Sequence, residues 1–525
     1  MTLAATPART RAPRLDGVTV AAALATLVCA TPAIAVIALA LISDGGAEFG
    51  GALIREGAMG TFGLVLAGGT GAIVFGATTA WLVTLCRFPG RGIFEWLLVV
   101  PLAAPSYILA YAYASMTWAG GAAVPVQGFG GAAFIYAIGL YPYVYLAARA
   151  AFASQSVCAL EAARMLGASP LRVFWQVALP LARPGIAAGG ALACMEIAAD
   201  YGAAQHFGLS TLSTAVFRAW YAHGSPGLAL QISAVLLVAA MVFLLVERGA
   251  RGRAAYSGGS ARWRPLPRYQ LNAVAGALAA VFCGALIVFG ALLPLMWLAR
   301  LALLHANVQD IVQPFVNSLA LSASGAAITL GLAAAIAVAA RRATTPLGKS
   351  PLFAAGMGYA APGAVIALGA LSLFGLAREA GLVGGLGAAL SLAALFWTYA
   401  ARFASAGVGP IDAGLARLST GLDASARTLG AGPWRRFAEI DLPIAAPSLA
   451  AAALILFVEI LKELPATLIL RPFNFDTLAV KAYSYASDER LLEAAAPSLL
   501  IFLAGIAPII ILARSIGRGR AGVTS

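Results

Sequence analysis

Apolar stretches long enough to cross a lipid bilayer recur along the whole chain and constrain its fold more than any other feature. A hydrocarbon core of ~30 Å needs about 20 apolar residues in a helix that rises ~1.5 Å per residue. About twelve such stretches are present. They fall at residues 18–43, 61–86, 95–117, 132–152, 186–207, 227–247, 273–298, 317–340, 351–376, 386–402, 449–470 and 491–513. The sequence therefore predicts an all-α integral membrane protein.

Composition supports the same fold class. The chain is 61% hydrophobic and 10% charged, whereas soluble domains are about 25% charged, so a soluble fold could not cover its own surface. The net charge of +13 comes mostly from Lys and Arg in the N-terminal arm, alternate loops and the C-terminal tail, a distribution typical of the positive-inside rule. We therefore expect a multi-pass protein of the bacterial inner (plasma) membrane, with both termini cytoplasmic and no nucleic-acid partner.

A polar segment occurs twice in this apolar chain. Residues 161–184 read EAARMLGASPLRVFWQVALPLARP, and residues 424–447 read ASARTLGAGPWRRFAEIDLPIAAP. Self-similarity at a fixed offset, here 263 residues, is the signature of an internal repeat. The identical positions include Gly167 and Gly430, Arg172 and Arg435, and Phe174 and Phe437.

The same offset relates two halves of six spans each. Six spans separate the two copies, and an even number returns the chain to the same side of the membrane, so the repeats are parallel and related by an axis along the membrane normal. We predict a first domain over residues 1–250, a cytoplasmic linker rich in Arg, Gly, Ser and Pro over residues 251–270, and a second domain over residues 271–525.

Each copy of the duplicated loop has the features of a docking surface. We expect a short helix that breaks at the glycine and a second short helix that starts near the following proline. Small residues permit close approach, and aromatic and arginine side chains are favoured anchors at protein interfaces. The alternative is that these elements only seat the membrane bundle. The candidate docking residues are Glu161, Ala162, Ala163, Gly167, Arg172 and Phe174 in the first copy, and Asp423, Gly430, Arg435 and Phe437 in the second.

The loop also carries a family resemblance. Glu161-Ala162-Ala163, Gly167 and the Leu-Pro exit resemble the EAA loop of binding-protein-dependent ABC importer permeases, in which the loop forms coupling helices that dock on the ATPase subunits. The second copy departs from this pattern, because Ala424 replaces the Glu and Asp423 lies one residue earlier; equal docking by the two copies is therefore in doubt.

Fusion of two such halves is similar to the ferric iron permeases of this family, as are the segments at 199–208, 211–221 and 462–483. The resemblance covers nearly the whole chain. It implies the type I importer permease fold, two copies of an ABC ATPase as partners, and a periplasmic binding protein that delivers the substrate. ATP and Mg would be held by the ATPase, so this chain is expected to be no enzyme and to need no cofactor.

The chain encodes no ATP-binding loop of its own. The nearest candidate is Gly348-Lys349-Ser350, which has Ala343 where the first glycine of a G-x-x-x-x-G-K-[ST] loop belongs. Hydrolysis is therefore assigned to a partner.

Carboxylates inside apolar spans mark a second candidate site. Glu196 and Asp200 lie four apart in one span, and Glu459 and Glu463 lie four apart at the corresponding place in the other half, so each pair is expected to share a helical face. A charge there costs roughly 2.5–3.5 kcal/mol on insertion scales and indicates a function or a partner. We expect the four acids to line a translocation path for a highly charged cation, which hard oxygen ligands suit. No metal site is assigned. Alternatively, the acids neutralise bases such as Lys462 or bind the backbone of broken helices.

The leading interpretation is the permease of an ABC importer for ferric iron delivered by a binding protein. Thiamine, polyamines and other small solutes remain alternative cargoes within the same class. An ion-coupled secondary transporter would also use intramembrane carboxylates, but that class predicts inverted repeats and leaves the duplicated loop unexplained.

Overall fold

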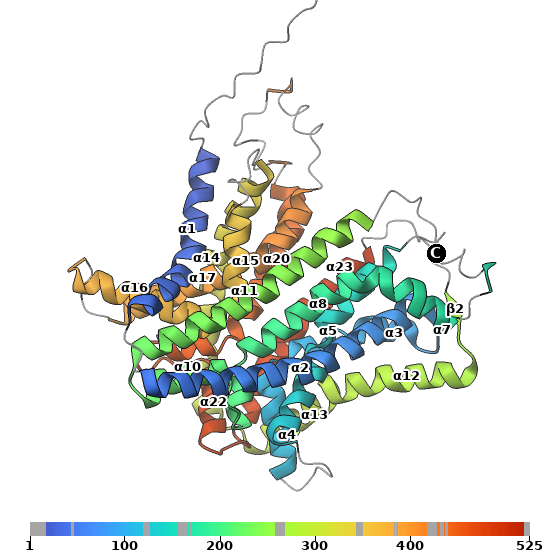
Figure 1. Ribbon diagram of the computed structural model, residues 1–525, viewed down its shortest axis with the longest axis horizontal. Helices are drawn as coiled ribbons and strands as arrows, with labels where there is room; N and C mark the ends of the chain where they lie inside the picture. Colours follow the sequence, from blue (N-terminus) through green and yellow to red (C-terminus); the bar gives the residue numbers. More distant parts are fainter. Residues whose placement is uncertain are drawn as a thin grey trace, which may run out of the picture.

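The fold is almost entirely helical (Figure 1). The computed structural model describes residues 17–43, 47–118, 126–155, 165–167, 170–257, 268–342, 350–382, 384, 387–416, 428–430, 435, 439–440 and 442–518. Within these residues one small sheet occurs, in which β1 (Cys86–Arg87) pairs in parallel with β2 (Tyr269–Gln270) and ties the end of α2 to the chain just before the second half.

The first half follows the predicted spans in order. Because its last helix continues to Ser257, the start of the predicted linker is helical. The elements are α1 (Gly17–Ile42), α2 (Ala47–Leu85), α3 (Arg91–Leu97), the 3₁₀ turn η1 (Val100–Ala103), α4 (Ser106–Trp118), α5 (Gly128–Ala153), α7 (Pro170–Val173), the π-helical segment η2 (Phe174–Ala178), α8 (Leu179–Ala199), α9 (Gly202–His206), α10 (Leu212–Phe217), the π-helical segment η3 (Arg218–Ala222) and α11 (Pro226–Ser257).

The second half has a similar sequence of helices. Its elements are α12 (Ala273–Ile287), the π-helical segment η4 (Val288–Leu292), α13 (Leu293–His305), α14 (Val308–Arg342), α15 (Ser350–Ala360), α16 (Gly363–Glu379), α17 (Ala388–Leu415), α20 (Leu442–Leu461), α21 (Pro465–Leu470), α22 (Leu478–Ser487) and α23 (Ala495–Arg518).

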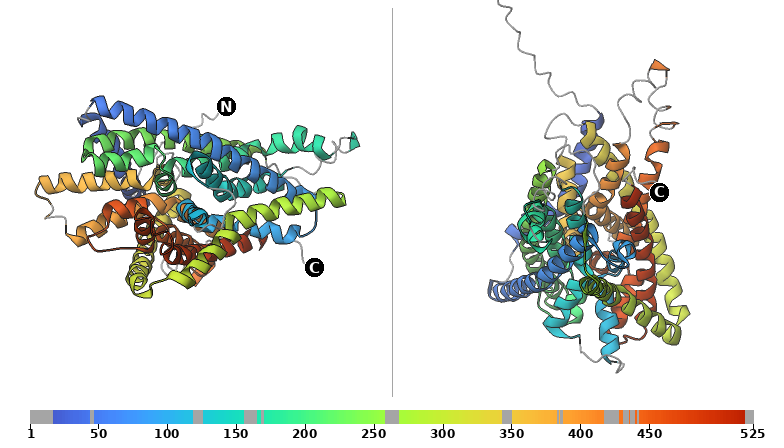
Figure 2. Two further views of the ribbon diagram at one scale, coloured as in Figure 1. Left: turned by 90° about the horizontal axis from the view of Figure 1, so that it is seen from below. Right: turned by 90° about the vertical axis from the view of Figure 1, so that its right-hand side faces the viewer.

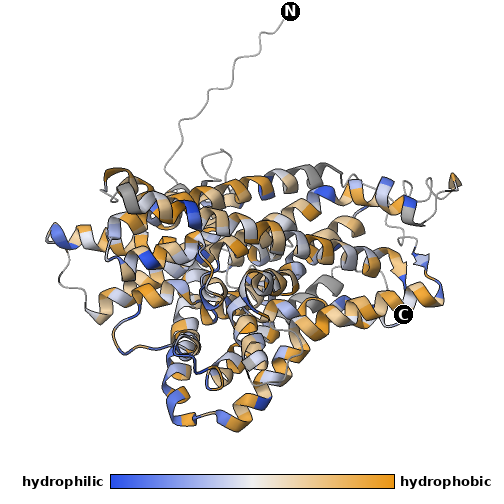
Figure 3. Ribbon diagram, turned by 60° about the horizontal axis from the view of Figure 1, so that its bottom comes forward, coloured by the Kyte–Doolittle hydropathy of each residue, from blue (hydrophilic) through white to orange (hydrophobic). Residues whose placement is uncertain are grey.

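The prediction of an integral membrane protein is confirmed. Among the described residues, 8 helices are long and apolar enough to cross a membrane, and two bent helix pairs raise the number to 10. The two other predicted stretches, 386–402 and 491–513, lie largely on α17 and α23. Coloured by hydropathy, the long helices are mostly apolar (Figure 3). Each of the roughly twelve predicted stretches thus corresponds to a helix or a bent pair.

The two bent pairs break at proline. Arg91–Ala103 and Ser106–Thr117 meet at 89°, and Ser350–Ala360 and Gly363–Glu379 meet at 111°. Pro105 and Pro362 stand at these breaks. Proline has no N–H to continue the helix and its ring clashes with the preceding turn, so a helix breaks there readily. Both breaks lie beside the cavity described below.

The two halves exchange their first helices. α1 packs against α14, α15, α16 and α17 of the second half, while α12 packs against α3, η4 against α5 and η1, and α13 against α4 of the first half. Figures 1 and 2 show α1 beside α15 and α12 beside α3. The halves therefore form one interleaved bundle, and the space between them is lined by helices from both.

Candidate functional site

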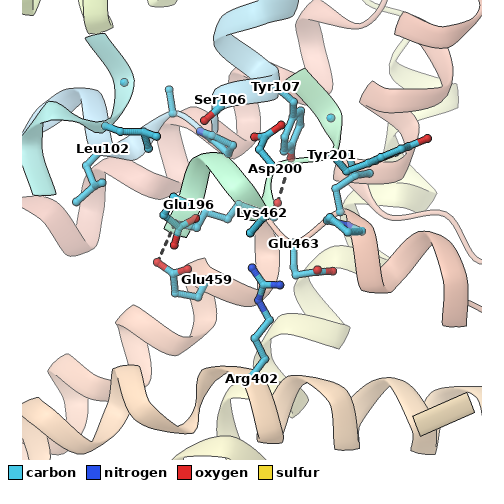
Figure 4. Close-up of a pocket in the computed structure, with 18 of the residues that line it drawn as sticks. Leu102, Ser106, Tyr107, Glu196, Asp200, Tyr201, Arg402, Glu459, Lys462 and Glu463 are labelled. Atoms are coloured by element: carbon cyan, nitrogen blue, oxygen red, sulfur yellow. Dashed lines mark hydrogen bonds and ion pairs between the residues drawn. The ribbon is translucent and has the colours of Figure 1, made fainter. Parts of the chain in front are cut away.

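The four predicted acids line one cavity between the two halves (Figure 4). Glu196 is on α8 and Asp200 directly follows it, whereas Glu459 is on α20 and Glu463 follows that helix. The cavity has a volume of about 110 Å³, which is more than a single water molecule needs. Structure thus brings together side chains that lie 263 residues apart in the sequence.

The expectation that each acid pair shares one helical face is wrong. α8 ends at Ala199, and Asp200 has an extended backbone with φ −69° and ψ 127°. α20 ends at Leu461, before Glu463. In each half a new short helix starts just beyond the break, α9 at Gly202 and α21 at Pro465. The second acid of each pair therefore belongs to the break and not to the long helix.

Asp200 and Glu463 cap these short helices in the same way. Asp200 Oδ1 accepts a hydrogen bond from the Ala203 N–H at 2.8 Å, and Glu463 Oε1 accepts one from the Ala466 N–H at 3.0 Å. Glu463 Oε2 also accepts from the N–H and the hydroxyl of Thr467, at 3.1 and 2.9 Å. Because the first N–H groups of a helix have no partner within it, the two carboxylates stabilise the helix starts. The alternative that the acids bind the backbone of broken helices therefore applies to both Asp200 and Glu463.

The other two acids differ from this pair and from each other. Glu459 forms an ion pair with Lys462, with 2.7 Å between Oε1 and Nζ, and both side chains are about one-fifth exposed. Glu196 makes no hydrogen bond within the described part of the chain, although the charges of Arg402 and Lys462 act on it. Glu196 is thus the one acid of the four whose carboxylate faces the cavity without a hydrogen bond to a described residue.

Arg402 of α17 is a cavity residue that the sequence-based prediction missed. Its guanidinium points toward Glu459 and Glu463 (Figure 4), and its Nε and Nη1 atoms are buried without a hydrogen-bond partner among the described residues. Gly363 packs so closely on Arg402 and Glu463 that a Cβ there would collide with both. The corresponding position of the first half is Gly139, which also lines the cavity. Arg402 lies at the end of a predicted apolar stretch. A charged residue in such a stretch indicates a functional site, as it did for the acids, so the sequence contained the signal for Arg402.

Tyrosines connect this cavity to a second one. Tyr143 and Tyr359 both line the acid cavity. Tyr359 also lines a cavity of about 440 Å³ between α8, α11, α15 and α17. Its lining residues on α8, Ala191 to Met195, precede Glu196 and so lie on the side from which the duplicated loop enters that helix. The second cavity therefore lies toward the loops, and Tyr359 belongs to the lining of both cavities.

The glycines of the duplicated loops adopt the same conformation. Gly167 has φ +76° and Gly430 has φ +79°, a left-handed conformation that glycine adopts without a steric penalty. The predicted break is therefore present in both copies. Five of the predicted docking residues lie outside the described residues. They are Glu161, Ala162 and Ala163 in the first copy and Asp423 and Phe437 in the second.

The described loop residues divide into exposed and packed side chains. Arg172 is exposed, and so is Arg435, which forms an ion pair with Glu439 at 3.0 Å. Phe174 instead faces the bundle, with its ring 4.7 Å from that of Trp81. The apolar side chains left exposed in the loops include Met165, Leu166, Trp175 and Leu429. Phe174 thus fixes the loop to the bundle, while its neighbours form the accessible surface.

Within the described residues, no group of three or more His, Cys, Asp or Glu side chains is arranged to hold a metal ion. The cavity acids are spread over two halves, and most of them already have partners.

Comparison with known proteins relates the chain to membrane transport. Residues 72–248 match the family described as "Binding-protein-dependent transport system inner membrane component". This match includes the first duplicated loop, Glu196 and Asp200.

Three relatives have transport names. The Fe(3+)-transport system permease protein FbpB 2 of Haemophilus influenzae is 25% identical over 453 residues, which cover 84% of this chain and 86% of that protein. The molybdenum transport system permease protein ModB of Escherichia coli K12 is 28% identical over 192 residues, 34% of this chain and 84% of that protein. The sulfate transport system permease protein CysT of Synechococcus elongatus is 35% identical over 130 residues, 23% of this chain and 46% of that protein. The similarity to the iron permease therefore extends over both halves.

Proposed function

We propose that this chain, whose residues 72–248 match the binding-protein-dependent transport family, forms the membrane path of an ATP-driven importer of ferric iron. The observation that carries this proposal is the convergence of four duplicated acids on one cavity between the halves. Carboxylate oxygens suit a hard, highly charged cation. A relative similar over 84% of this chain is named as a ferric iron permease, which supports the same cargo.

The partners follow from the family and from the two loops. We expect a periplasmic binding protein to deliver the cargo and two copies of an ABC ATPase to dock on the duplicated loops, one on each. ATP and Mg belong to those ATPase subunits. We place the loops and both termini on the cytoplasmic side of the inner membrane, because Lys and Arg gather there. Glu161, Ala162, Ala163 and Asp423 are proposed to take part in docking.

The loops are connected directly to the helices that bear the acids. η2 continues into α8, which carries Glu196, and the second loop leads into α20, which carries Glu459. A packed helix moves as a unit, so a displacement of the loop by the ATPase would shift the acid on that helix. We propose that this linkage alters the cavity during each cycle and moves the cargo past Tyr359 toward the cytoplasmic side.

The test is selective uptake. Cells that lack this chain and cells that express it with its binding protein and ATPase are supplied with ⁵⁵Fe(III), and in parallel with labelled molybdate, sulfate, thiamine or spermidine. We expect ATP-dependent accumulation of ⁵⁵Fe only in the cells that express the chain. Accumulation of another solute without ⁵⁵Fe would reject ferric iron as the cargo while retaining the importer.

A further inference from the structure

The cavity holds a cationic side chain, Arg402, two nitrogen atoms of which make no hydrogen bond to a described residue. Nε and Nη1 of Arg402 are buried and donate no hydrogen bond to a described residue, although four acids line the same cavity. Glu463 is occupied by N–H and hydroxyl groups of α21, and Glu459 is paired with Lys462. Free donors on Arg402 therefore coexist with a carboxylate on Glu196 that has no hydrogen bond to a described residue.

A guanidinium whose N–H groups lack acceptors is suited to bind an oxyanion. Its planar fork fits the paired oxygens of a carboxylate or a phosphate, and buried donors without acceptors are unfavourable. Arg402 and Lys462 offset part of the attraction that the four cavity acids exert on a bare trivalent cation. An iron ion that carries a bound oxyanion lessens this opposing effect and supplies the missing acceptors.

We propose that Arg402 forms an oxyanion subsite and that ferric iron crosses the membrane together with a small bound carboxylate or phosphate. The metal faces Glu196 and Glu459, and the oxyanion faces Arg402. This inference rests on the proposed function, because it takes ferric iron as the cargo. The first half has Gly139 at the position that corresponds to Arg402. Among the described lining residues Arg402 is therefore the single arginine, which matches a cargo with one anionic side.

The experiment is double-label uptake by proteoliposomes that contain the complete complex of this chain, its ATPase and its binding protein. ⁵⁵Fe(III) is supplied with [¹⁴C]citrate in one arm and with [³³P]phosphate in the other. We expect one anion label to accumulate in a constant ratio to ⁵⁵Fe, and the arm in which it does so identifies the oxyanion. Entry of ⁵⁵Fe without either anion contradicts the subsite and leaves the proposed function intact. Failure of ⁵⁵Fe to enter at all contradicts both.

Variants test the residue itself. Arg402→Gln is expected to lower uptake of both labels by about tenfold or more, because a charge-assisted bidentate contact is lost, whereas Arg402→Lys keeps the charge and retains part of the uptake. Arg341→Gln is the matched control, since Arg341 is exposed outside the cavity and pairs with Asp412 at 3.2 Å. Recovery of the complex with its ATPase reports whether each variant assembles. Uptake by Arg402→Gln equal to or faster than that of the wild type overturns the proposal.

Discussion

At the scale of single residues, the four cavity acids have two different roles. Asp200 and Glu463 are held by the N–H groups of the short helices that follow them. Glu459 pairs with a side chain, and Glu196 has only long-range charge partners within the described residues. Asp200 and Glu463, which the 263-residue offset relates, therefore share a role because both lie at the helix break, whereas Glu196 and Glu459 occupy equivalent helix positions but differ in their partners.

These roles predict different effects on stability. Glu463→Ala removes the acceptor of buried N–H groups and should lower the free energy of unfolding by about 1–3 kcal/mol. Glu196→Ala is the matched control and should leave it nearly unchanged. Thermal unfolding of the purified proteins in one detergent measures both. An equal loss of stability in the two variants would show that Glu463 has no special capping role.

At the scale of elements, each loop glycine precedes, in sequence, the helix that carries an acid, α8 after Gly167 and α20 after Gly430. No atom of the described residues lies within 4 Å of the position of a Cβ at Gly167 or Gly430, so among these residues only the positive φ resists substitution. Left-handed backbone costs an ordinary residue roughly 1–2 kcal/mol.

Gly167→Ala should therefore strain the loop and reduce the amount of ATPase that copurifies with this chain. Gly92→Ala is the control, because Gly92 also has open space around it but lies in the helix α3 without a positive φ. Equal recovery of ATPase with both variants would argue against the loop conformation as a determinant of docking.

Local signals explain which parts of these elements could be predicted. Apolar length, charges in apolar stretches and repeated glycines can all be recognised in short segments of sequence. The helices, the four acids and the breaks at the two loop glycines could therefore be predicted. The ends of α8 and α20 could not be predicted, because the apolar pattern continues through residues 207 and 470 while the helices end earlier, at Ala199 and Leu461. Arg402 was missed since its neighbours come from α15, α20 and the α21 start, which no local pattern connects.

At the scale of the whole molecule, the exchange of first helices makes the two halves interdependent. α1 packs on the second half, and α12 to α13 pack on the first. Similarity between the halves predicts two alike units but says nothing about which helix packs on which unit, so this arrangement comes from the structure alone.

Residues 1–257 and 268–525 expressed together as separate chains should therefore assemble, because helix packing and not the connecting segment holds the halves together. Either half alone should be poorly soluble in detergent, since part of the packing surface for its first helices belongs to the other half. Copurification through a tag on one half measures assembly. A stable, monodisperse single half would contradict the interleaved core.

The most direct measurement of the central claim is the rate of ⁵⁵Fe(III) uptake by proteoliposomes that hold the complete complex, with wild-type chain or with Glu196→Gln combined with Glu459→Gln. If these carboxylates line the path, uptake should fall by about tenfold or more, since each loss of about 1.4 kcal/mol in stabilisation is a factor of ten in rate, while the ATPase still copurifies. Wild-type uptake by the double variant would contradict the claim that the acids form the cation path.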